Sequence, residues 1–85
     1  MPEIARFFGI TITMYYRDHE PAHLHAKYGE CRLVVDIESG AFRGDFPPRV
    51  LAFVLEWWGR HRLDLEEDWE RARAGQDLRR IAPLE

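Results

Sequence analysis

Four side chains that can transfer protons or bind metal ions lie close together in the first third of this 85-residue chain. They are Asp18, His19, His23 and His25. Imidazole titrates near neutral pH, which suits general acid–base catalysis, and neutral imidazole is a common metal ligand. Arg17 and Lys27 flank the cluster and could stabilise an anionic phosphate. The segment therefore predicts a polar site for a charged ligand, and these six residues are its candidates.

The spacing of His23 and His25 favours convergence of their rings. Both lie in "HLHAKY", which has a strand pattern, and residues two apart on a strand project from the same face. A turn through Pro21 would fold Asp18 and His19 back towards the same end of this strand. We therefore expect the two rings to meet Asp18 or His19 across the loop.

Three interpretations of this cluster remain open from the sequence. In the first, His23 and His25 bind a divalent metal ion together with Asp18 or His19. In the second, the chemistry is metal-free, with one histidine as base and another as acid. In the third, the histidines only hydrogen-bond the loop to the sheet. A His-x-His pair is not specific by itself, so the identity and even the presence of a metal cofactor stay undetermined.

The elements that must position this cluster are strands, because the first half of the chain has a strand pattern. Apolar and polar residues alternate from Ile10 to Tyr15, and Gly9 separates this stretch from an earlier β-rich one. Two further strands are expected over "HLHAKY" and "CRLVVDI", and a short strand-like piece over "AFRG" should follow them.

Helical periodicity begins after "DFPP". Two prolines suit a helix start, and the apolar residues of 50–58 cover more than one face, so this helix should pack between the sheet and other protein. Asp64 and Glu67 resemble a capping box that opens a second helix, and Gly75 would end it. The three tryptophans are expected in the core or at an interface rather than stacked on bases. The last residues could form a strand or an ordered arm.

These elements predict an α+β fold, with an antiparallel sheet from the N-terminal half packed against two C-terminal helices in a single domain of residues 1–85. Hydrophobic residues make up 46% of the chain, which argues against disorder. The net charge of -3 argues against a protein that binds nucleic acid through a basic surface all round. One cysteine, no leader pattern and no bilayer-length apolar run indicate a cytoplasmic protein without membrane association. No phosphate-binding glycine loop or nucleophile elbow is present.

The segment "MYYRDHEPAHLHAKYG" and the late "WERARAG" carry a family resemblance. They match the core M-Y-x-x-D-H-x-P-x-H-x-H-x-x-Y-G and W-x-x-A-x-x-G of a small bacterial family of unknown function. Some members of that family are named as DhiT-type toxins of type II toxin–antitoxin pairs. The resemblance implies a cytoplasmic toxin with an antitoxin partner encoded by a neighbouring gene. It also brings Tyr28 into the substrate-binding candidates, and it supplies no established catalytic residue.

Two classes of function follow from these observations. The first is a toxin-like component that acts on RNA, as a ribonuclease, through the Asp18–His25 region. The second is a non-catalytic protein-binding module or a small metal-binding domain. A domain of this size could also form a homodimer to cover apolar helix surface.

Overall fold

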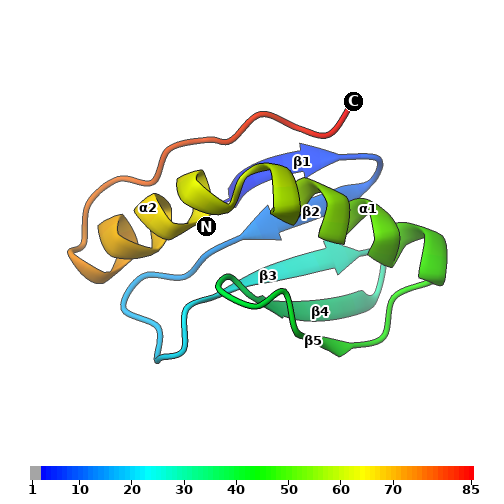
Figure 1. Ribbon diagram of the computed structural model, residues 1–85, viewed down its shortest axis with the longest axis horizontal. Helices are drawn as coiled ribbons and strands as arrows, with labels where there is room; N and C mark the ends of the chain where they lie inside the picture. The colour runs from blue at the N-terminus through cyan, green and yellow to red at the C-terminus, as the bar shows by residue number, and fades with distance from the viewer. Residues whose placement is uncertain (1–2) are drawn as a thin grey trace.

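The computed structural model describes residues 3–85, which form a five-stranded antiparallel sheet and two helices (Figure 1). The strands are paired in chain order, so the sheet is a simple meander. Their bounds are β1 Glu3–Phe7, β2 Ile10–Thr13, β3 His23–Tyr28, β4 Cys31–Asp36 and β5 Phe42–Gly44. The helices are α1 Pro48–Arg60 and α2 Arg62–Arg73. The predicted α+β fold is confirmed.

The two faces of the sheet differ as the alternation predicted. One face is apolar and fully buried under the helices. It carries Ile10, Ile12, Leu24, Ala26, Leu33 and Val35. The other face carries mostly polar and charged residues, and the register aligns its residues in rows across the strands. Thr13, His25 and Val34 form one such row, and Thr11, Lys27 and Arg32 form the next.

Helix α1 covers the apolar face of the sheet, as its apolar pattern predicted. Pro48 occupies the first turn, where a missing amide donor is not needed, and Val50, Val54 and Trp57 are buried. The indole N–H of Trp57 donates a hydrogen bond to the Ala82 carbonyl over 2.8 Å. Trp57 therefore belongs to the core and also holds the C-terminal segment.

Helix α2 begins earlier than the capping-box pattern indicated. It starts at Arg62, and His61 is its N-cap without a side-chain capping bond. The prediction of a capping box at Asp64 is wrong because α1 runs to Arg60 and leaves only one residue between the helices. Asp64 already lies inside the first turn, where its carboxylate is 3.6 Å from His61 Nδ1. Gly75 follows the helix with φ +73°, as expected for its end.

The C-terminal segment, residues 76–85, is an ordered arm rather than a strand. It runs along β1, where the Ile81 amide donates to the Ile4 carbonyl over 2.8 Å (Figure 1). Asp68 of α2 fixes its start, because the Arg79 amide donates to Asp68 Oδ1 over 2.9 Å. Asp68 is buried, and this burial raises the pKa of its carboxyl group despite the hydrogen bond.

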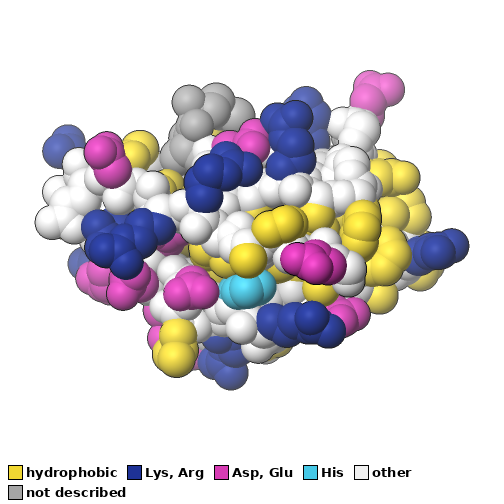
Figure 2. Space-filling view, turned by 90° about the horizontal axis from the view of Figure 1, so that it is seen from above, with side chains coloured by type: hydrophobic (Ala, Val, Ile, Leu, Met, Phe, Trp, Pro, Cys, Tyr) yellow, Lys and Arg dark blue, Asp and Glu magenta, His cyan; other side chains and the backbone are white. Residues whose placement is uncertain are grey.

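Apolar side chains gather at the end of the molecule where the β1–β2 turn, the start of α1 and the C-terminus meet. Figure 2 shows them as a continuous group towards the right, whereas basic and acidic side chains alternate elsewhere on this view. Phe8, Phe53 and Leu84 line a hollow of about 580 Å³ there. Among residues 3–85, no helix has the length and apolar character needed to cross a membrane.

Candidate active site

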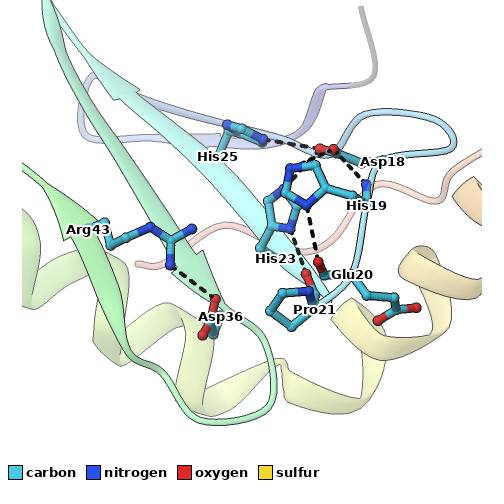
Figure 3. Close-up of polar contacts among 8 residues, drawn as sticks. All are labelled: Asp18, His19, Glu20, Pro21, His23, His25, Asp36 and Arg43. Atoms are coloured by element: carbon cyan, nitrogen blue, oxygen red, sulfur yellow. Dashed lines mark hydrogen bonds and ion pairs between the residues drawn. The ribbon is translucent and has the colours of Figure 1, made fainter.

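The loop between β2 and β3, residues 14–22, brings Asp18 to the histidines of β3 (Figure 3). Asp18 Oδ2 lies 2.9 Å from Nε2 of His23 and 3.5 Å from Nε2 of His25. The two imidazole rings lie 5.1 Å apart between centroids. The predicted convergence of His23 and His25 across the Pro21 loop is confirmed, and Asp18 is the residue that joins them.

The protons of His23 are fixed by its surroundings. Nδ1 lies 2.7 Å from the Pro21 carbonyl oxygen, which can only accept, so Nδ1 carries a hydrogen. In the neutral ring, Nε2 then presents a lone pair to the Asp18 carboxylate, which is also an acceptor. Two acceptors 2.9 Å apart need either a hydrogen or a bound cation between them.

The remaining protonation states suit a cation. Burial acts to raise the pKa of Asp18, but hydrogen bonds from the His19 amide and both rings, together with the charge of His23, outweigh burial. The pKa of Asp18 is therefore below its usual value. Burial lowers the pKa of His25, and its bond to Asp18 offsets this only partly. An ionised carboxylate and a neutral imidazole are the forms that bind metal ions.

Helix α2 holds the loop in place. The Arg17 amide donates to the Ala72 carbonyl over 3.3 Å, and an ion pair of 3.0 Å joins Glu20 to Arg73. The buried ring of Trp69 lies 5.4 Å from His23 and closes the inner side of the site. The two segments that carry the family resemblance therefore meet here, although about forty residues separate them in the chain.

His19 takes a different position from the other three residues. Its side chain is 79% exposed, and Nε2 lies 3.7 Å from Asp18 Oδ1. Its Nδ1 hydrogen-bonds the Glu20 carbonyl over 3.1 Å, and its backbone amide donates to Asp18 Oδ1 over 2.8 Å. His19 thus orients Asp18 through the backbone and leaves its ring at the mouth of the site, where it could exchange protons with a ligand.

The substrate-binding candidates are not all brought to this site. Lys27 is exposed on the same face of β3 as His25, two residues further along the strand. The guanidinium of Arg17 instead lies against Gly75, beyond the end of α2. Tyr28 projects from the opposite, apolar face, where its ring packs 6.2 Å from that of Phe46.

Two neighbours of the cluster were not identified from the sequence. The ring of Tyr15 makes an edge contact with His25, with centroids 4.7 Å apart, and fixes its orientation. Trp69 does the same for His23 from α2. The strand alternation gave a signal for Tyr15, since it lies two residues beyond Thr13 at the end of β2, but no local pattern links Trp69 to the site. Asp36 lies opposite His23 in the register and is 3.9 Å from Arg43 (Figure 3).

The donor set fits a divalent metal ion. One ligand atom each from Asp18, His23 and His25 lies within 4.8 Å of the others. Ligand atoms at 2.0–2.2 Å from a tetrahedral zinc ion are roughly 3.3–3.6 Å apart. The 3.5 Å between Asp18 Oδ2 and His25 Nε2 matches this spacing, and the 2.9 Å to His23 Nε2 would need to lengthen. The hydrogen bond from His23 Nδ1 to a backbone carbonyl is the outer contact that orients metal-binding histidines. Three protein ligands leave a coordination position for water or substrate.

Comparison with known proteins gives a family for the chain. The model described as "Domain of unknown function (DUF4160)" matches residues 9–70, a stretch that includes the whole cluster and Trp69. The chain belongs to this family. The comparisons found no matching curated protein and no matching solved structure.

Proposed function

We propose that this protein is the toxin-like component of a type II toxin–antitoxin pair and that it cleaves RNA at the Asp18–His23–His25 cluster with a divalent metal ion. The observation that carries the chemistry is the position of the Asp18 carboxylate against the Nε2 atoms of both histidines. The resemblance of the two motif segments to toxin-like proteins supports the biological role.

The chemistry of the cluster suits phosphodiester hydrolysis. When bound, a divalent ion lowers the pKa of a water molecule and supplies a nucleophile at neutral pH. Hydrolysis of a phosphodiester would form a bond from water oxygen to phosphorus, release one proton of that water to solvent, break the bond to the leaving ribose oxygen and protonate that oxygen. In this scheme His19, which lies at the mouth of the site, donates the proton to the leaving oxygen. Asp18, His23 and His25 are the metal-binding residues in this scheme.

The decisive experiment expresses the protein with and without its neighbouring gene and sequences cellular RNA. Wild type alone should arrest growth and produce new RNA ends, because the cluster is intact. The His23→Ala/His25→Ala protein should produce neither, because two of three donor atoms are lost. His61→Ala removes the fourth histidine, which lies between the helices, and should behave as wild type if it folds. A folded double variant that still arrests growth would remove the cluster from the mechanism.

A second observation favours a protein partner. Phe8 and Gly9 form the two-residue β1–β2 turn, and both have positive φ, 51° and 79°. Such turns favour asparagine followed by glycine, and a bulky residue with positive φ is strained. Phe8 is nevertheless 51% exposed, and its ring lies 5.0 Å from that of Phe53. We propose that this apolar turn is where the antitoxin binds.

Phe8→Asn tests this surface. Asparagine tolerates positive φ, so relief of strain should offset the lost ring contact and keep the free energy of unfolding within about 1 kcal/mol of wild type. Affinity for the neighbouring gene product should fall at least about tenfold, as for an aromatic interface anchor. Calorimetric titration measures this change, with the exposed Leu63→Ser on α2 as control. Unchanged affinity would place the partner elsewhere.

A further inference from the structure

Within residues 3–85, neither helix covers the polar face of the sheet, because α1 and α2 pack against the other face and the C-terminal arm runs along β1 (Figure 1). The register places four residues in one row across four strands of this face. From β1 to β4 they are Arg6, Thr11, Lys27 and Arg32. This row contains three cations and no carboxylate, in a protein whose net charge is -3.

The next row leads to the candidate active site. It places Thr13 and Val34 on either side of His25, whose Nε2 faces Asp18. Lys27 and His25 are two residues apart on β3, which corresponds to roughly 6.6 Å along the strand. The cationic row therefore lies directly beside the cluster.

The two rows line a hollow of about 700 Å³ on this face. Its lining includes Thr11, Thr13, Lys27 and Arg32 together with Tyr15 and His25. The carboxylate on its border, Glu3, is already paired with Arg6 at 2.7 Å and Arg80 at 3.1 Å. Among residues 3–85, neither Lys27 nor Arg32 lies within ion-pair distance of a carboxylate. Their charges are available to an outside anion.

Aromatic and hydroxyl groups accompany these cations. Tyr15 lies against His25 with part of its ring exposed, and Tyr16 next to it is also exposed. Aromatic rings stack on unpaired bases, while hydroxyl groups and cations bind phosphate oxygens. A short, open sheet face with this set of groups suits a single strand, whose bases are free to stack, better than a duplex.

We propose that this uncovered sheet face, through Lys27 and Arg32, binds the phosphate backbone of a single-stranded nucleic acid and directs it to the Asp18–His23–His25 cluster. RNA is the strand expected, and this choice rests on the proposed function. The binding of a phosphate backbone follows from the sheet face itself and does not require cleavage.

The test compares two double variants of the full chain that lose the same charge. Lys27→Gln/Arg32→Gln removes the unpaired cations of the sheet face, and Arg49→Gln/Arg60→Gln removes two exposed cations of α1. Fluorescence anisotropy measures binding of a labelled 12-nucleotide RNA over a range of salt concentrations, and a gel checks that the RNA stays intact. The same DNA sequence, duplex RNA and a poly-glutamate peptide are the comparison ligands.

We expect the sheet-face variant to bind the single-stranded RNA at least tenfold more weakly and the α1 variant to bind like wild type. The slope of log affinity against log salt should fall by about 1.4, since each phosphate contact on a single strand contributes about 0.7. Equal binding of single-stranded RNA and DNA supports the proposal, because both share the backbone. The proposal would be overturned if both variants lost RNA affinity equally or if wild type did not bind the RNA. Tighter binding of the duplex or of poly-glutamate than of the single strand would also overturn it.

These results also separate this inference from the proposed function. Binding that depends on Lys27 and Arg32, without any RNA cleavage in cells, would support the sheet face and contradict the ribonuclease activity. Cleavage that persists at wild-type KM in the Lys27→Gln/Arg32→Gln protein would support the activity and overturn the role of the sheet face.

Discussion

Replacement of His23 by alanine should weaken zinc binding by more than about 100-fold. Loss of an outer contact to a metal ligand typically costs 10–100-fold in affinity, and His23 is proposed to bind the metal directly. It is also the ring whose orientation is most constrained, by the Pro21 carbonyl on one side and Trp69 on the other. Isothermal titration of zinc into the metal-free protein measures this difference.

Two variants serve as controls for this measurement. His19→Ala should bind zinc nearly as well as wild type, because its side chain is exposed and Asp18 is held by the His19 backbone amide, which alanine retains. Asp18→Asn should weaken zinc binding, because the amide lacks the carboxylate charge. If folded His23→Ala protein binds zinc as wild type does, the cluster is not a metal centre.

The pH dependence gives an independent check on the same site. Metal ions bind the ionised Asp18 and the neutral His25, so protons compete with the metal. Both groups have a pKa below its usual value, so both remain in the binding form at neutral pH. Zinc affinity should therefore be stable near pH 7, persist through the ordinary histidine value of about 6.5 and fall only at lower pH, because the pKa of His25 lies below that value.

The metal-free interpretation has the opposite pH dependence. Protonated imidazoles attract phosphate, so a metal-free site should bind a short RNA more tightly as the pH falls through the same range. RNA binding that strengthens on acidification, in protein that shows no zinc binding, would favour acid–base chemistry by the histidines alone.

The sequence predicted the fold well because its patterns are local. Alternation from Ile10 to Tyr15 predicted β2. Gly9 in "FFGI" and Gly29 in "HLHAKYG" lie in hairpin turns, and both have positive φ. Pro47 and Pro48 marked the start of α1, the first as its N-cap and the second in its first turn. The start of α2 was wrong, since the capping pattern at Asp64 gave no information about how far α1 extends. Because α1 extends to Arg60, α2 begins at Arg62, before the capping pattern.

The site was only partly predictable for a similar reason. Strand alternation was enough to place His23 and His25 together. It could not choose between Asp18 and His19, because the path of the loop depends on Ala72 and Arg73 in a distant helix. Tyr28 was brought in by its presence in the motif, although strand parity places it on the apolar face. Arg6 and Arg32 join Lys27 in one row of the sheet face through strand register, which no single motif contains.

Trp57→Ala should have the largest effect on stability, a loss of about 3–5 kcal/mol in the free energy of unfolding. The side chain is fully buried, and its ring centroid lies 5.5 Å from that of Phe7, so its removal leaves a large cavity in the core. The change also removes the indole N–H that donates a hydrogen bond to the Ala82 carbonyl, so the C-terminal arm should loosen. Urea unfolding measures the loss, and hydrogen exchange at the Ile81 amide reports on the arm.

Trp57→Phe separates the two contributions. Phenylalanine keeps much of the buried ring but has no N–H, so the loss should be smaller, with about 1–3 kcal/mol from the unpaired carbonyl alone. Trp58→Phe is the matched control, because Trp58 is only half-buried and its N–H donates to the Ile37 carbonyl over the same 2.8 Å. The total stability of a small domain is about 5–15 kcal/mol, so Trp57→Ala should unfold at much lower urea concentration than wild type. A loss below about 1 kcal/mol for Trp57→Ala would mean that the helix layer does not depend on this ring.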